Sequence, residues 1–176
     1  MTATRMQLDS AGRITTKKTE KGFWSKEGSR NRMKRLIVMV LLMLALATPA
    51  AADLNTVSEK TPEELAVYMH PETRHLAEDV IRICKEQEVS AEFIAAVMRW
   101  EKRPDLHNWF GWTEGKLMTF DSDLQCLETV IPKIKENYLT PGGIYYNGAT
   151  VEGVSKYYNN TEFWRETIQD EVERMG

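Results

Sequence analysis

Cysteine and histidine are scarce in this chain, which has two cysteines and three histidines among 176 residues. No Cys-x-x-Cys pair occurs, and His70, His75 and His107 show no metal-ligand spacing. A glycine-rich phosphate-binding loop and a Gly-x-Ser-x-Gly nucleophile elbow are also absent from the sequence. We therefore predict no metal site and no cofactor.

Basic residues are few outside the N-terminal segment. Residues 1–35 carry ten Lys and Arg against three Asp and Glu, whereas the remainder carries 13 against 23. Nucleic-acid binding relies on clustered Lys and Arg that neutralise phosphates, so an acidic body argues against such a partner. Residues 1–32 are polar and unpatterned, and we predict a disordered extension or sequence upstream of a working start at Met33.

A long apolar run is missing too. Leu36–Ala47 is about a dozen residues long, well short of the roughly 20 that a membrane span requires. Two basic residues precede the run and an Ala-x-Ala site follows it, as in a secretory signal peptide. We predict a signal peptide at residues 33–52 with cleavage before Asp53, and hence an exported protein. The alternative is anchoring by residues 36–52.

The two cysteines, Cys84 and Cys126, lie beside aliphatic residues in segments with helical periodicity. Export would permit a disulfide between them. Two small buried thiols are the simpler interpretation, so we predict free thiols and keep the disulfide as the alternative.

The mature chain is expected to form a linker and one helical domain. Residues 53–72 are polar and predict the linker. Residues 73–176 show helical periodicity interrupted by turn signals, which predicts one mainly α-helical domain. Within it, Trp109–Phe120 contains a turn signal between apolar residues and predicts a small hairpin or irregular lobe.

Capping residues and prolines set the expected helix ends. Ser90 precedes an apolar helical pattern, and Pro104 forces Arg103 out of helical geometry, so this helix is expected to end at or just after Glu101. Further helices are expected at residues 73–88, from Ser122 with a kink or break at Pro132, from Thr150 to Tyr158, and after Thr161.

Glu101 lies on the apolar face of its expected helix, seven residues after Ile94 and four after Val97. Apolar surroundings and the negative end of the helix dipole both favour a protonated carboxyl group there. A glycosidase uses such a group as its general acid. The alternative is a surface glutamate that pairs with Lys102 or Arg103.

Aromatic residues gather after this glutamate. Their flat apolar rings with polar edges suit packing against sugar faces. We therefore expect substrate binding by Trp109, Phe110, Trp112, Tyr145 and Tyr146, with a core position for the tryptophans as the alternative.

Three motifs occur in a fixed order: "EFIAAVMRWE", "NWFGWTEGKLMTFDS" and "YYNGATVEGVSKYYNNTEFWRETIQDEV". Together they resemble the bacterial glucosaminidase family of lysozyme-like, peptidoglycan-cleaving hydrolases, over about Thr73 to Met175. The resemblance implies a lysozyme-like helical fold and cleavage of β-1,4 bonds in peptidoglycan after N-acetylglucosamine. It also implies these residue roles: Glu101 as the catalytic acid, Tyr158 assisting across the cleft, and Asn108, Phe110 and Gly111 lining the cleft, with Asn108 also binding substrate. The alternative for Tyr158 is a core tyrosine with a satisfied hydroxyl.

The segment after the glutamate departs from the family pattern. The family usually has Ser-Gly-Trp-Gly or similar there, whereas this chain has "EKRPD". A second catalytic carboxylate is not fixed by the sequence, and Asp105, Glu114 and Asp121 are candidates. If none of them reaches the cleft, the N-acetyl group of the substrate could act as the nucleophile.

We thus expect a monomeric glycosidase that acts on peptidoglycan glycan strands and meets the membrane only through its signal segment. One alternative is a muramidase or lytic transglycosylase on a related fold. Another is a wall-binding or envelope-assembly protein with an inactive cleft.

Overall fold

The computed structural model describes residues 5–8, 14–17 and 52–176. The chain divides into two units, Met1–Ala50 and Ala51–Gly176. The predicted signal peptide lies outside the described residues except for its last residue. No helix in the described part of the chain is long and apolar enough to cross a membrane.

In the first unit, two short strands pair. Strands β1 (Arg5–Leu8) and β2 (Ile14–Lys17) run antiparallel, with Arg5 opposite Lys17. The sequence predicts a disordered extension at residues 1–32, whereas residues 5–8 and 14–17 form strands. Strand β2 begins with three β-branched residues, which favour extended backbone.

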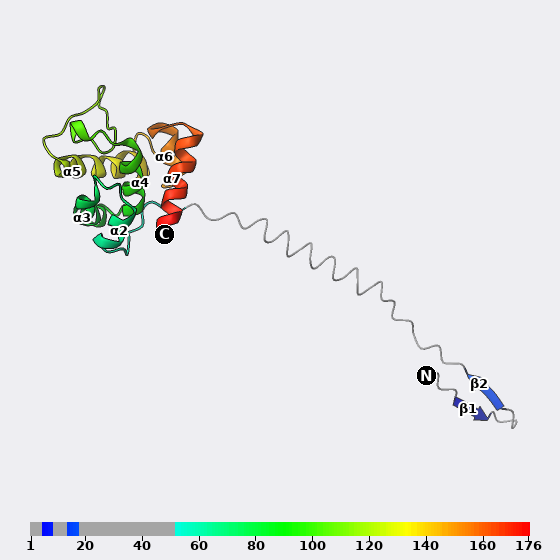
Figure 1. The fold of residues 1–176 in the computed structure, drawn as a ribbon. Coiled ribbons are helices and arrows are strands. Elements are labelled where there is room, and N and C mark those ends of the chain that lie inside the picture. The colour runs from blue at the N-terminus through cyan, green and yellow to red at the C-terminus, as the bar shows by residue number, and fades with distance from the viewer. Residues whose placement is uncertain (1–4, 9–13, 18–51) are drawn as a thin grey trace. The chain divides into compact units, whose positions relative to one another are not determined.

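The second unit is mainly helical, and α4 lies between α5 on one side and α7 on the other in Figure 1. Its helices are α2 (Pro62–Tyr68), η1 (Arg74–Leu76), α3 (Ala77–Gln87), α4 (Ala91–Glu101), η2 (Pro104–Leu106), α5 (Asp123–Ile134), η3 (Lys135–Leu139), α6 (Val151–Tyr158) and α7 (Glu162–Met175).

Residues 53–72 are not a linker, contrary to the sequence-based prediction. Leu54, Leu65 and Met69 are buried in the same core as the downstream helices. These three apolar residues are spaced among polar ones and form no helical stripe long enough to recognise in the sequence, yet packing buries all three. The packed domain therefore begins by Leu54 rather than at Thr73.

The predicted helix starts are confirmed. Ser90, Ser122, Thr150 and Thr161 are the N-caps of α4, α5, α6 and α7, and each side-chain oxygen accepts a backbone N–H three residues further on. Caps of this kind typically contribute about 1 kcal/mol each. Local sequence thus fixes where these four helices begin.

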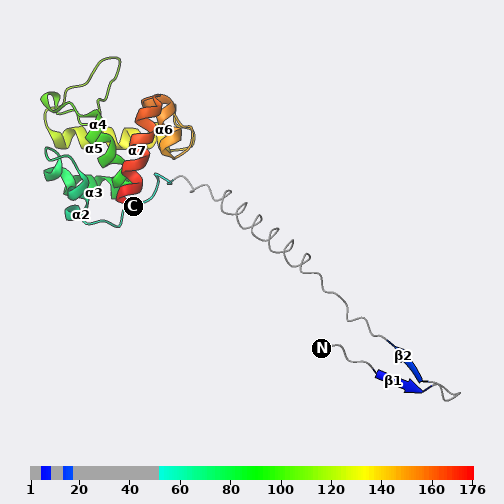
Figure 2. The ribbon, with the colours of Figure 1, turned by 45° about the vertical axis from the view of Figure 1, so that its right-hand side comes forward.

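Helix α4 is the helix that carries Glu101, and it packs against α2, α3 and α7 (Figures 1 and 2). Phe93, Ile94, Val97 and Met98 are all completely buried. Burying one such side chain contributes roughly 1.5–3 kcal/mol, so α4 is firmly anchored in the core. Its last residue is Glu101, as predicted from the proline that follows.

Between α4 and α5 the chain is irregular and extends away from the helices (Figure 2). An isolated bridge pairs Thr113 with Leu117, in agreement with the expected small hairpin. Helix α5 continues through Pro132 and changes into the π-helical turn η3 directly after Ile134. Pro132 therefore does not split the helix. The π-helical turn η3 begins within one turn after it.

Cys84 in α3 and Cys126 in α5 are free and buried, as predicted. Burial raises the pKa of the Cys84 thiol strongly. Burial also raises the pKa of the Cys126 thiol, to about 12. Both side chains act as small apolar core groups.

Candidate active site

Asn108 holds together the loop that follows Glu101, and it is fully buried. Its amide nitrogen donates to the carbonyl oxygens of Trp112 (3.0 Å) and Met118 (2.9 Å), and its side-chain oxygen accepts the Trp112 N–H (2.8 Å). Its backbone makes a two-bond bridge with Arg103. Because these bonds occupy the amide inside the protein, the prediction that Asn108 binds substrate is corrected: it shapes the loop.

Gly111 lies directly against Glu101. A methyl group added at Gly111 would lie 3.2 Å from Glu101 Oε2 and 3.2 Å from the Glu101 carbonyl oxygen. Gly111 also has a φ of +58°, a conformation that residues with a Cβ atom adopt at a cost. The position therefore requires glycine for two reasons, and it leaves the space beside Oε2 clear.

The other carboxylate oxygen of Glu101 is held by Asn159, which directly follows α6. Asn159 Nδ2 donates to Glu101 Oε1 at 3.2 Å. The Asn159 side-chain oxygen accepts the Thr161 hydroxyl at 3.0 Å, and that hydroxyl in turn accepts the Trp164 N–H as the cap of α7. This chain of hydrogen bonds orients the amide so that its donor faces Glu101.

Glu101 lines a cleft of about 490 Å³. This volume lies within the range of small-molecule binding sites. Among the described residues, Glu101 is the one carboxylate that lines it. The other lining residues are Trp100, Lys102, Arg103, Gly111, Thr113 and Leu117.

None of the three candidate second carboxylates lines this cleft. Glu114 forms an ion pair with Lys133, and the hydrogen bond from Lys133 is the main reason that the pKa of Glu114 is lowered. Asp105 and Asp121 are exposed. The structure thus brings no carboxylate partner to Glu101 within the described part of the chain.

Most of the aromatic residues predicted to bind substrate are buried. Trp109, Phe110 and Trp112 are 3%, 1% and 8% exposed, so they form the core beneath the loop and cannot stack on a sugar from these positions. The alternative interpretation, that the tryptophans are core residues, is the correct one. Tyr145 and Tyr146 are partly exposed but do not line the Glu101 cleft.

Tyr158 at the end of α6 links the aromatic core to the Glu101 loop. Its hydroxyl donates to the Phe110 carbonyl at 2.6 Å, and its ring stacks on Trp164 with centroids 5.6 Å apart. Burial, and then the nearby Glu101 carboxylate, raise the pKa of Tyr158 well above its ordinary value. The phenol therefore stays protonated. Its oxygen still has a lone pair that can accept a hydrogen bond or interact with a positive charge.

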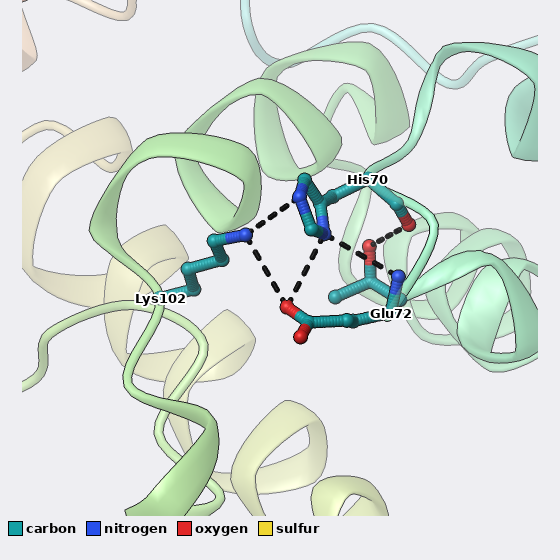
Figure 3. A network of polar contacts seen from close by, with 4 residues as sticks. His70, Glu72 and Lys102 are labelled. Carbon is teal, nitrogen blue, oxygen red and sulfur yellow. Dashed lines mark hydrogen bonds and ion pairs between the residues drawn. The ribbon is translucent and has the colours of Figure 1, made fainter.

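Lys102, next to Glu101, turns toward a separate polar network (Figure 3). Its ammonium lies 2.7 Å from His70 Nε2 and 3.3 Å from Glu72 Oε2. His70 Nδ1 is also 3.3 Å from the same Glu72 oxygen. Because Lys102 pairs with Glu72, the predicted alternative of a Glu101–Lys102 pair is not what the described residues form.

Two residues of this site were not predicted from the sequence. Asn159 reaches Glu101 across 58 positions of sequence, and no local pattern indicates that contact. Trp100 lines the cleft and is 47% exposed. Its position beside the apolar stripe of α4 was the available signal, because an indole on the outer face of a buried helix is unusual.

The arrangement places one carboxyl group in a cleft, with one oxygen bound to an amide and the other beside a glycine. Such a group can deliver or take up a proton. A scan against protein-family models finds no match for this chain, and a search of curated proteins finds no significant relative.

Proposed function

We propose that the protein is an exported, monomeric, lysozyme-like glycoside hydrolase. It cleaves β-1,4 bonds in peptidoglycan, after N-acetylglucosamine, with Glu101 as the general acid and no cofactor. The observation that carries this proposal is the cleft in which Glu101 Oε1 accepts from Asn159 while Oε2 lies beside Gly111. A proton on Oε2 is the one available to a glycosidic oxygen.

The lack of a second carboxylate in the described cleft favours substrate assistance. Glu101 protonates the leaving oxygen as the C1–O bond breaks, and the acetamido oxygen of the substrate bonds to C1. Water then adds to C1, returns a proton to Glu101 and restores the acetamido group. This route is an established exception to the two-carboxylate scheme. Tyr158 does not line the cleft, and its hydroxyl donates to the Phe110 carbonyl next to Gly111. Its assisting role in this proposal is therefore to hold the loop against Glu101.

Release of reducing sugar from purified peptidoglycan tests this function in wild type and Glu101→Gln. We expect Glu101→Gln to fold normally and to lose activity by about 10²–10⁴-fold, because glutamine cannot donate the proton. Equal, non-zero release by the two proteins would falsify the assignment. Mass spectrometry of the released ends separates a glucosaminidase from a muramidase or lytic transglycosylase.

A binding protein with an inactive cleft is the second candidate. It is favoured by Lys102 and Arg103, which stand where the resembling family has small residues. This candidate predicts that insoluble peptidoglycan retains wild type and Glu101→Gln equally, without release of reducing ends from either.

Export belongs to the same proposal. Leu54, the second residue after the predicted cleavage point, is already part of the core, so a chain that starts at Asp53 would retain the packed domain. N-terminal sequencing of secreted protein should find Asp53. Recovery of residues 36–52 with the membrane fraction would instead identify an anchor.

A further inference from the structure

Arg103 is the cation of the cleft that no internal carboxylate neutralises. Of the two cationic residues that line the cleft, Lys102 is paired with Glu72. Arg103 is exposed and has no carboxylate within ion-pair distance among the described residues. Four other arginines of the same domain do pair with carboxylates: Arg82, Arg99, Arg165 and Arg174.

The backbone of Arg103 is fixed in place. Its N–H donates to the Asn108 carbonyl at 2.7 Å, and its carbonyl accepts the Asn108 N–H at 3.1 Å. Pro104 follows directly and further restricts the backbone at Arg103. The guanidinium is therefore presented from a rigid base two residues after Glu101, which limits the conformational entropy lost when it binds a ligand.

Apolar surface lies in the same cleft. Trp100 and Leu117 both line it and are 47% and 40% exposed. The Trp100 ring packs edge-on against Phe163, with centroids 6.0 Å apart, which supports the indole from one side. A supported, exposed indole offers a flat face for a sugar ring.

We propose that Trp100 and Arg103 form a subsite for a carboxylate-bearing sugar, in which the indole contacts the ring and the guanidinium binds the carboxylate. This inference rests on the proposed function and names its substrate class: anionic glycan rather than neutral N-acetylglucosamine polymer. The rest of the chain after residue 35 has 12 basic residues besides Arg103 against 23 acidic ones, so it would repel an anionic strand without a local cation. Arg103 supplies that cation beside the acid, and guanidinium geometry suits bidentate carboxylate binding.

Two sources of carboxylate exist on peptidoglycan. Strands stripped of stem peptides expose the lactyl carboxylate of each muramic acid. Strands that keep their peptides have that group in an amide bond, and their carboxylates belong to the peptide. The chemistry at Arg103 is the same for both, so the ligands used in the experiment must separate them.

The test measures dissociation constants with the full chain carrying Glu101→Gln, so that no ligand is consumed. The three ligands are a neutral N-acetylglucosamine tetramer, peptide-free strands and peptide-bearing strands. We expect Arg103→Gln to weaken binding of at least one anionic strand about tenfold, the loss of a charge-assisted hydrogen bond, and to leave the neutral tetramer unchanged. Arg103→Lys should retain part of the affinity.

Arg74→Gln is the matched control, because Arg74 is also exposed and without an ion pair among the described residues but does not line the cleft. It should leave all three affinities unchanged. A loss confined to peptide-free strands assigns the lactyl carboxylate, a loss confined to peptide-bearing strands assigns the stem peptide, and a loss on both supports carboxylate recognition in general. If Arg103→Gln lost as much affinity for the neutral tetramer as for the anionic strands, or lost none for either strand, the subsite alone would be overturned. Failure of every glycan to bind the Glu101→Gln chain would overturn the proposed function together with it.

Discussion

Asn159 donates from its amide nitrogen to Oε1 of Glu101 at 3.2 Å, and Thr161 fixes the other end of that amide. Removing this donor should leave the fold intact while disturbing the acid. We expect Asn159→Ala to lower kcat by about tenfold or more, because a displaced carboxyl group transfers its proton less efficiently.

Asn159→Asp makes the same test sharper. Aspartate keeps the shape but cannot donate, and it adds a negative charge that repels the Glu101 carboxylate, so its loss of kcat should exceed that of Asn159→Ala. Asn160→Ala is the control, because Asn160 is exposed and makes no side-chain hydrogen bond among the described residues. An unchanged kcat in both folded Asn159 variants would show that this hydrogen bond does not position the acid.

The thiols provide a prediction about chemical reactivity. Because burial raises the pKa of Cys126 to about 12, only about 1 in 10⁴ of its side chains is a thiolate at pH 8, and Cys84 should be less reactive still. Neither thiol should be alkylated in the folded protein, and both should react after denaturation. Mass spectrometry after iodoacetamide treatment measures this. A single alkylated thiol in the native protein would show local opening at that helix.

Asp123 at the start of α5 provides a prediction about pH. His107 Nδ1 lies 2.6 Å from one of its oxygens and His75 Nε2 lies 3.4 Å from the other. Partial burial opposes ionisation, but the hydrogen bonds, led by His107, outweigh it and lower the pKa of Asp123 below its ordinary 3.8. A lowered folded-state pKa stabilises the fold above the unfolded-state value, and this stabilisation is lost as the pH falls through the folded-state pKa.

We therefore expect Asp123→Asn to reduce the free energy of unfolding by about 1 kcal/mol at pH 7, by weakening these hydrogen bonds. The difference from wild type should shrink as the pH falls below about 4. Urea unfolding at a series of pH values measures both. Asp121→Asn is the control, since Asp121 is exposed and forms no ion pair among the described residues. A difference that stays constant down to pH 3 would contradict the assignment.

Local chemistry explains why the helix starts could be predicted and much of the site could not. Ser90 and Thr161 act on backbone groups three residues away, so each cap is readable in a short window of sequence. The Asn159–Glu101 bond joins α6's end to α4's end and depends on how the helices pack. Trp109 illustrates a further limit, because a tryptophan that fills a core and one that stacks on a ligand have the same local sequence pattern.

Gly111 lies close to Glu101, so substitutions there and at a distant glycine can distinguish the effect of backbone strain on stability from the effect of crowding Glu101 on activity. Gly111→Ala places a methyl group 3.2 Å from Oε2 and from the carbonyl oxygen of Glu101, so the carboxyl group must move. We expect a loss of activity of about tenfold, because the carboxyl group must shift by less than the displacement of about 1 Å that can cost 10²-fold, and about 1 kcal/mol lower stability from the positive φ. Gly115→Ala is the matched control, because Gly115 has a φ of +75° with no atom within 4 Å of an added methyl group. It should lose similar stability and keep its activity. Reducing-sugar release and thermal melts of the two variants measure these effects, and equal activity in both would show that the space beside Oε2 is not used by the reaction.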